Sequence, residues 1–227
     1  MSKIYISPSQ QDKNVGYGNY GTERDRMFQI ANSLKIILER CGQTVYIAKK
    51  GMTFQQAVTE SNKLKCNIHL AIHSNAFNKT CRGTQTMYVS TQGKVLSDLI
   101  YAQLSAFTPT VDRGSKRNDN LYELNETNAV CAYLELMFHD NKDDAALIIN
   151  NIEKIAELIA KGVCKYTGTK YIGKPVVAKI QIDQNVLELQ KLLNKFGVTD
   201  QNNNVLDTDG IIGHKTKVAL NKLISKL

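Results

Sequence analysis

Strand-like and helix-like segments alternate through most of the first 165 residues of this chain. Short apolar runs predict strands at residues 3–7, 44–48, 67–73, 84–90, 121–124 and 131–138. Between these runs, apolar residues recur every three or four positions, which is the period of an amphipathic helix. Strands that alternate with helices pair mainly in parallel. We therefore expect an α/β fold, a twisted, mostly parallel sheet of about six strands with helices on both faces.

Residues 167–181 interrupt this pattern with Gly, Pro and Lys. Two further helical patterns follow it, separated by the turn Asp209-Gly210-Ile211-Ile212-Gly213. We expect an α/β domain at residues 1–166, a linker at 167–181 and a small all-α domain at 182–227. The last is small for independent stability but feasible.

The chain is basic, with 29 Lys and Arg against 21 Asp and Glu, a net charge of +8. Residues 165–181, which include the expected linker, hold four lysines and no acid. An excess of positive charge favours a polyanionic partner, either nucleic acid or a bacterial wall that bears anionic polymers. There is no Arg-rich helix and no basic-aromatic ladder of the kind that reads bases. Charge alone therefore does not choose between them.

No run of about 18 apolar residues predicts a membrane span. The first six residues, MSKIYI, lead directly into a strand-like segment and lack the apolar region of a signal peptide. We therefore expect synthesis in the cytosol without secretion. The five cysteines are scattered and form no C-x-x-C pair, which favours reduced thiols over disulfides or a zinc knuckle.

Three ionisable residues are expected at one end of the sheet. His73 ends a buried strand, Glu23 follows a good N-cap residue at a helix start, and Glu135 lies inside an apolar run. Ligands bind α/β sheets outside the carboxyl ends of the strands, and a buried carboxylate is costly unless it is paired or bound to metal. The structural alternatives are that His73 merely ends a strand and that Glu135 forms an ion pair with Arg113.

Six stretches of the chain, in this order, resemble the zinc-dependent N-acetylmuramoyl-L-alanine amidases, the type 3 amidases, and more closely a clostridial and phage branch of that family. They cover about residues 3–166 and are Ser7-Pro8-Ser9-Gln10-Gln11, Tyr20-Gly21-Thr22-Glu23, residues 68–76 (IHLAIHSNA), Asp112-Arg113-Gly114, residues 121–129 (LYELNETNA) and residues 134–141 (LELMFHDN).

The resemblance implies that Zn²⁺ is bound by Glu23 and His73, and that Glu135 is the catalytic residue. The family's first ligand, a histidine after the first strand, is missing, because no histidine precedes residue 69. We predict that Gln11 replaces it, with Gln10 and His139 as the open alternatives. Four residues of a strand span about 13 Å, so His69 cannot share a metal with His73 and is expected to be structural.

The substrate implied by the resemblance is peptidoglycan, cleaved at the amide bond between the lactyl group of N-acetylmuramic acid and L-alanine. Arg113 and Lys116, on a polar stretch at residues 110–120, are candidates for binding the carboxylates of the stem peptide, although a solvated charged loop explains them equally well. Asn75 and His139 are further candidates for substrate contacts. Residues 182–227 resemble peptidoglycan-binding helical domains through Leu189-Gln190, the turn at 209–213 and Lys215-Thr216.

We therefore expect a cell-wall hydrolase whose partners are peptidoglycan and the anionic wall surface, with no nucleic acid. A phage endolysin, held in the host cytoplasm until release to the wall, is the first interpretation, and a bacterial autolysin or spore-cortex hydrolase is the second. One rival is a wall-binding protein that has lost catalysis, and another is a carboxypeptidase on the same scaffold. The sequence does not fix the first metal ligand, the peptidoglycan chemotype or the oligomeric state.

Overall fold

The computed structural model describes residues 1–109, 113–174 and 183–225. These form two compact units, Met1–Lys174 and Pro175–Leu227, and each is considered by itself. The predicted linker (167–181) lies partly outside the described residues, and its boundaries stay predictions.

The larger unit is built on a six-stranded sheet with the order β2-β1-β3-β6-β4-β5. The strands are β1 (Lys3–Pro8), β2 (Thr44–Ile47), β3 (Ile68–Asn75), β4 (Gln85–Tyr88), β5 (Ser115–Arg117) and β6 (Val130–Phe138). Every neighbouring pair is parallel except β4 and β6. The predicted fold class, a mostly parallel sheet of six strands, is confirmed.

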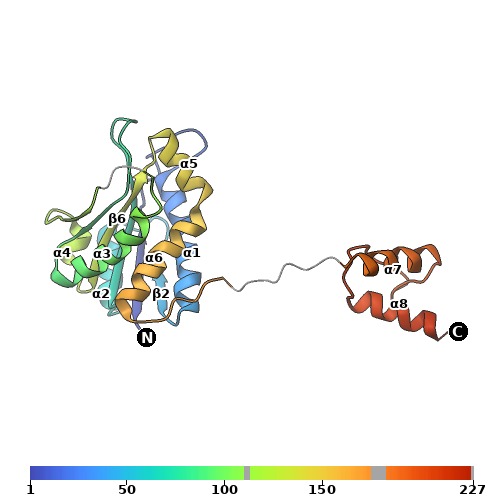
Figure 1. The fold of residues 1–227 in the computed structure, drawn as a ribbon. Coiled ribbons are helices and arrows are strands. Elements are labelled where there is room, and N and C mark those ends of the chain that lie inside the picture. The colour runs from blue at the N-terminus through green and yellow to red at the C-terminus, as the bar shows by residue number, and fades with distance from the viewer. Residues whose placement is uncertain (110–112, 175–182, 226–227) are drawn as a thin grey trace. The chain divides into compact units, whose positions relative to one another are not determined.

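Helices cover both faces of this sheet (Figure 1). The helix α6 (Ile152–Thr167) packs against both α1 (Glu23–Arg40) and α3 (Thr91–Ser105). The helices α2 (Phe54–Lys63) and α4 (Tyr122–Glu126) contact each other, and they also contact β1 and β6 respectively. The chain places α5 (Lys142–Asn150) directly after β6. The apolar residues of β1, β3 and β6 are almost completely buried, so the middle of the sheet forms the core.

Two local predictions were wrong. Residues 121–124, expected as a strand, lead into α4, and the polar stretch expected as a loop contains β5. A short apolar run does not distinguish a strand from a buried helix turn. The three residues of β5 carry no apolar alternation and take strand form by pairing with β4. After β6, Asn151 separates the helices α5 and α6.

Helix starts follow the expected capping chemistry. The Thr22 hydroxyl accepts a hydrogen bond from the Asp25 amide at 3.2 Å, which places Glu23 as the first residue of α1. At the start of α2, Thr53 and Gln56 form a reciprocal capping box. These two caps hold both helix starts in place at the ends of their loops.

The smaller unit contains α7 (Gln184–Lys195) and α8 (His214–Ile224), which share an apolar cluster that includes Leu193 and Ala219. The buried Gln190 amide donates to Asp209 Oδ1 at 2.8 Å and to Thr216 Oγ1 at 3.1 Å, and its oxygen accepts from the Gly210 amide at 2.9 Å. One side chain therefore fastens the 209–213 turn to both helices.

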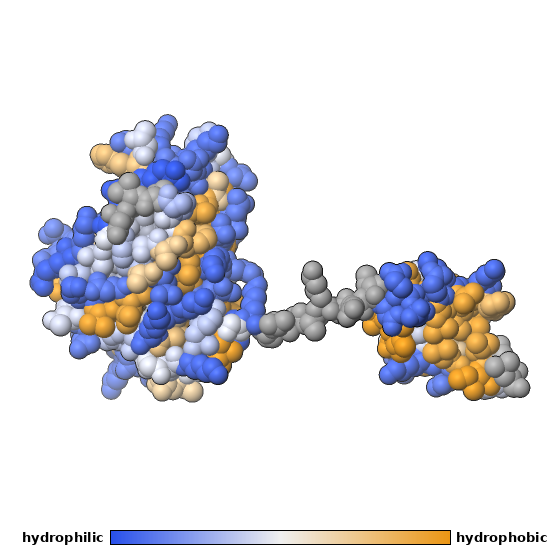
Figure 2. Space-filling view, viewed as in Figure 1, coloured by the Kyte–Doolittle hydropathy of each residue, from blue (hydrophilic) through white to orange (hydrophobic). Residues whose placement is uncertain are grey.

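Polar residues cover most of the visible face of the larger unit, with apolar side chains showing along its helices (Figure 2). No helix among the described residues is long and apolar enough to cross a membrane. All five cysteines are free, and four of them are buried.

Candidate active site

The ends of β3 and β6 bring His73 and Glu135 together. The two residues are direct partners in the parallel pairing of these central strands. Beyond them, Asn75 pairs with Phe138, so β6 contains one extra residue, and Met137 takes a left-handed conformation with φ of 60°. Such a bulge re-aims side chains near functional sites. Because paired residues point to the same face, Phe138 lies on the face of Glu135.

Glu23 enters this site from the start of α1 and is completely buried. Its carboxylate accepts hydrogen bonds from Asn14 Nδ2 at 2.8 Å and from the Ser74 amide at 3.3 Å, and Oε1 lies 3.0 Å from His73 Nδ1. Burial alone would raise the pKa of this carboxyl group, but the hydrogen bond and charge of His73, with bonds from Ser9 and Asn14, lower it below its ordinary value. Glu23 is therefore a buried anion.

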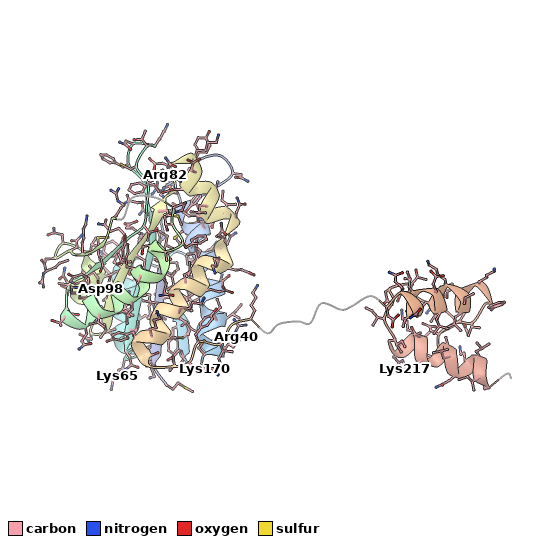
Figure 3. The ribbon with its side chains drawn as sticks, in the orientation of Figure 1. Arg40, Lys65, Arg82, Asp98, Lys170 and Lys217 are labelled. Carbon is pink, nitrogen blue, oxygen red and sulfur yellow. The ribbon has the colours of Figure 1, made fainter. Side chains whose placement is uncertain are left out.

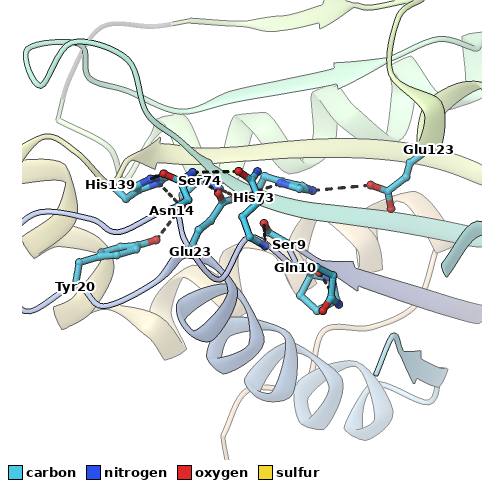
Figure 4. A network of polar contacts seen from close by, with 11 residues as sticks. Ser9, Gln10, Asn14, Tyr20, Glu23, His73, Ser74, Glu123 and His139 are labelled. Carbon is cyan, nitrogen blue, oxygen red and sulfur yellow. Dashed lines mark hydrogen bonds and ion pairs between the residues drawn. The ribbon is translucent and has the colours of Figure 1, made fainter. Parts of the chain in front are cut away.

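His73 lies between carboxylates (Figure 4). Its Nε2 faces Glu123 Oε2 at 3.8 Å, opposite the Glu23 contact, and its ring stacks on Tyr133 with centroids 4.6 Å apart. Burial disfavours the charged imidazole, yet Glu123, Glu23 and Glu135 together raise the pKa of His73 to about 10. Without a metal, the site therefore holds a cation among three carboxylates.

Glu135 differs from Glu23 and Glu123 because the charge of His73 only partly offsets the cost of its burial. Among the described residues, its buried Oε2 has no hydrogen-bond partner. Burial raises the pKa of this carboxyl group to about 7, the charge of His73 opposes the shift, and Glu23 adds to it. The expected structural alternative, an ion pair with Arg113, is not present: Arg113 donates to the Arg82 carbonyl oxygen at 3.2 Å and lies over the Phe138 ring.

The three alternatives for the first metal ligand lie in different surroundings. Gln10 is turned toward the 49–51 loop, where its side chain bonds the Lys49 carbonyl at 3.3 Å and the Gly51 amide at 2.9 Å. Gln11 Oε1 accepts from Asn14 Nδ2 at 3.3 Å, which places it next to a partner of Glu23.

His139 is buried and both of its ring nitrogens are hydrogen-bonded, Nδ1 with Ser74 Oγ at 2.8 Å and Nε2 with Asn14 Oδ1 at 3.0 Å. Its ring stacks on Tyr20, whose hydroxyl also bonds Ser74 at 2.8 Å. This network holds Asn14 against Glu23. Within residues 1–109, 113–174 and 183–225, no set of three or more His, Cys, Asp or Glu side chains is grouped to hold a metal ion.

Sequence reasoning assigned no role to Glu123. The start of α4 places this buried carboxylate between two histidines, with His69 Nε2 at 3.1 Å from Oε1 and His73 on the other side. Burial opposes its ionisation, but hydrogen bonds from both histidines lower the pKa of Glu123 to about 2. The available signal was the spacing of the histidines, because residues 69 and 73 of one strand face the same side and need a common counter-charge. His69 is structural in this arrangement, since it is buried against Glu123 and Tyr5.

The expected substrate-binding residues do not all lie together. Asn75 ends β3 beside the site, and Arg113 reaches the Glu135 face through its contact with Phe138. Arg82, the partner of Arg113, lies at the end of the unit opposite Lys65 (Figure 3). Lys116 is exposed on β5, which is separated from β6 by β4. Asp112, part of the motif around Arg113, lies outside the described residues.

A cleft of about 450 Å³ opens beside His73. It is lined by the end of β1, by Tyr133, and by the starts of α2 and α4, including Phe54, Tyr122 and Glu123. A concave, partly apolar site next to ionisable groups is the usual form of a small-molecule binding site.

An open α/β sheet with ionisable residues gathered at the carboxyl ends of its central strands has its ligand site at that edge, as α/β enzymes do. The model of the N-acetylmuramoyl-L-alanine amidase family matches residues 4–165, and the chain belongs to this family of cell-wall hydrolases. It is an N-acetylmuramoyl-L-alanine amidase, as predicted.

Known proteins agree with this assignment. The endolysin of Bacillus phage SPP1 is 28% identical over 186 residues, which is 75% of this chain and 68% of that protein. The catalytic domain of CwlV, an amidase from Bacillus (Paenibacillus) polymyxa var. colistinus, superposes with a TM-score of 0.69 at 22% identity, over 75% of this chain and all of that one. The catalytic domain of the CD27L endolysin gives 0.65 at 23% identity, over 76% of this chain and all of that one.

Proposed function

We propose that the chain cleaves the amide bond between N-acetylmuramic acid and L-alanine of peptidoglycan with a water activated by Zn²⁺. The observation that carries this proposal is the Glu135 carboxylate beside the His73–Glu23 pair, whose buried Oε2 has no hydrogen-bond partner in the part of the chain that the structure describes. A carboxyl group with a pKa of about 7 is matched to proton transfer near neutral pH.

The side chains present fit a zinc ion. Two donors bound to one tetrahedral zinc at about 2.0–2.1 Å lie roughly 3.3 Å apart, close to the 3.0 Å between His73 Nδ1 and Glu23 Oε1. A bound cation would also balance the charge of the carboxylates that otherwise stabilise the protonated form of His73. We propose His73 and Glu23 as ligands, with Gln11 as the third, a weaker neutral oxygen donor. When bound, zinc would lower the pKa of a water and polarise the substrate carbonyl.

The residues of the chain then share the remaining work. Glu135 accepts a proton from the water while the water oxygen attacks the amide carbonyl carbon. Glu135 then gives that proton to the alanine nitrogen as the C–N bond breaks. The products are the lactyl carboxylate and a free alanine amine, so the proton balance closes. Arg113, Asn75 and Lys116 remain candidates for holding the substrate, whereas His139, buried with both ring nitrogens bonded, would instead hold Asn14 in place. Arg113 is favoured for a stem-peptide carboxylate, because it lies on the face of Glu135.

We further propose an endolysin role, in which the protein accumulates in the host cytoplasm and then acts at the wall. Residues 182–227 would bind peptidoglycan, and the lysines of the predicted linker would favour the anionic wall surface. The endolysin of Bacillus phage SPP1 supports this interpretation.

The test is incubation of the purified full chain with peptidoglycan, followed by assay of new alanine amino termini and of bound zinc. We expect amino-terminal alanine to be released, activity to be lost after chelation and to be restored by zinc. Release of D-alanine alone would indicate a carboxypeptidase. Binding to the wall without zinc and without release would indicate a non-catalytic wall-binding protein, which the missing histidine ligand favours.

A further inference from the structure

We propose that the cleft beside His73 binds the saccharide part of the substrate, with Phe54 and Tyr122 as its aromatic contacts, while the peptide extends toward Arg113. This inference rests on the proposed function, because it divides the same substrate between the two sides of the His73–Glu135 pair.

The aromatic pair is the first observation. Phe54, the first residue of α2, and Tyr122, the first of α4, meet edge to face with ring centroids 5.4 Å apart. Both line the cleft, yet they remain 47% and 42% exposed. Two large rings held at a cleft wall without burial offer apolar surface to a ligand. A sugar ring has an apolar face of C–H groups that suits such a surface.

The polar groups of the cleft fit a neutral ligand. The Asn120 amide lines it and can both donate and accept hydrogen bonds, and Gln11, whose oxygen is the proposed zinc ligand, adds the donor NH2 group of its amide. Hydroxyl and acetamido groups of an N-acetylated sugar have the matching capacity. The described lining contains the Glu123 carboxylate and no Lys or Arg, so an anionic peptide is disfavoured there.

The strand order assigns the opposite side to the peptide. His73 and Glu135 lie on β3 and β6, in the middle of the sheet. The cleft is lined by the end of β1 and the residues after it, by the starts of α2 and α4, and by Tyr133 of β6, and none of its described lining residues comes from β4 or β5. Arg113 directly precedes β5, on the far side of β4. A substrate whose scissile bond lies over the central pair therefore places a neutral end in the cleft and an anionic end toward Arg113.

The experiment measures binding and cleavage separately in the full chain. Binding uses di-N-acetylchitobiose, a neutral disaccharide, and the free tripeptide L-Ala-D-Glu-L-Lys, each titrated by NMR. Cleavage uses a disaccharide-linked muramoyl tripeptide and a lactoyl tripeptide without sugar. The variants are Phe54→Ala and Tyr122→Ala, singly and together, with Tyr122→Phe to retain the ring. Ile36→Ala is the matched control, because Ile36 is an exposed apolar residue of α1 outside the cleft.

We expect each alanine variant to weaken disaccharide binding and to raise KM for the disaccharide substrate roughly tenfold. The peptide ligand, the lactoyl substrate and kcat should change little, and Tyr122→Phe and Ile36→Ala should behave as the wild type. Equal losses on both substrates, or tripeptide binding that depends on Phe54, would overturn the proposal, as would unchanged disaccharide binding in the double variant. If the wild type cleaves neither substrate but binds the disaccharide through these rings, the proposed reaction fails while the cleft assignment stands.

Discussion

Replacement of Glu135 by glutamine should make the metal-free protein more stable and far less active. The carboxylate is buried next to Glu23 and lacks a hydrogen-bond partner among the described residues, so folding at neutral pH forces a charge into an unfavourable place. Glutamine keeps the shape of the side chain and removes that charge. A residue selected for stability would show the opposite behaviour.

The magnitude follows from the pKa of Glu135, which burial raises from 4.5 to about 7. A carboxyl group whose pKa is raised on folding binds its proton more tightly in the folded state. Its burden on stability is therefore absent near pH 4, grows as the pH rises from 4.5 to 7, and is complete above pH 7. One unit of pKa corresponds to about 1.4 kcal/mol, so the ionised Glu135 lowers the free energy of unfolding by about 3 kcal/mol. Because the glutamine amide also lacks a full set of partners, we expect a gain of about 1–3 kcal/mol at pH 8.

The assay is urea unfolding of the full chain in the presence of EDTA, followed by far-ultraviolet circular dichroism at pH 4.5 and pH 8. The wild type and Glu135→Gln should unfold alike at pH 4.5, and the variant should be more stable at pH 8. Amidase activity of the zinc-loaded variant should fall by about 10²–10⁴-fold, the usual contribution of a general acid–base residue.

The matched control is Glu39→Gln. Glu39 is exposed on α1 and bonds Lys35 at 2.7 Å, so its loss should cost about 0.5 kcal/mol or less and leave activity unchanged. If Glu135→Gln were destabilising at pH 8, the carboxylate would have a partner and the reasoning would be refuted. If its activity were retained, Glu135 would not be the proton acceptor.

Three further changes test the surroundings of the site. Glu123→Gln removes the carboxylate that faces the His73 imidazole, and zinc affinity measured by chelator competition should fall about 10–100-fold, as for other carboxylates that orient a ligand; unchanged affinity would make its role purely structural. Gln11→His should tighten zinc binding at least tenfold in the same assay, whereas Gln10→His should not, because Gln10 points to the 49–51 loop; the reverse order would assign the ligand position to Gln10. Gly162→Ala would place a Cβ 2.6 Å from the backbone of α3 and should destabilise the larger unit by about 1–3 kcal/mol, measured by thermal unfolding. The control Gly173→Ala meets only an ordinary 3.7 Å contact and should be nearly neutral. Similar melting temperatures for the two variants would show that α3 and α6 adjust to the added methyl group.

The sequence was informative where one residue type has one physical explanation. A good N-cap residue predicted the helix start that carries Glu23, and apolar runs predicted the strands that end at His73 and contain Glu135. The pairing of those strands then follows from a parallel sheet. The resemblance to the amidases added the roles expected of these three residues, zinc binding and catalysis, which charge and periodicity could not supply.

The missed features depend on contacts between distant segments. The three polar residues of β5 form a strand only because β4 offers an edge. Glu123 was read as part of a strand, and only the turn into α4 brings it to the two histidines. The links from Asn14 to Glu23 and His139 span 9 and 125 positions of the chain, and no local pattern predicts them.

The bulge in β6 changes how this segment should be compared between proteins. Counting every second residue from Glu135 assigns Met137 and then His139 to the reactive face, as a regular strand would require. The extra residue shifts that phase by one, so the phenyl ring of Phe138 takes the place and the Arg113 guanidinium stacks above it. With this one extra residue, the His139 imidazole is buried and the Arg113 guanidinium lies on the face of Glu135. An alignment that treats β6 as a regular strand will therefore assign the residues after Glu135 to the wrong face of the sheet.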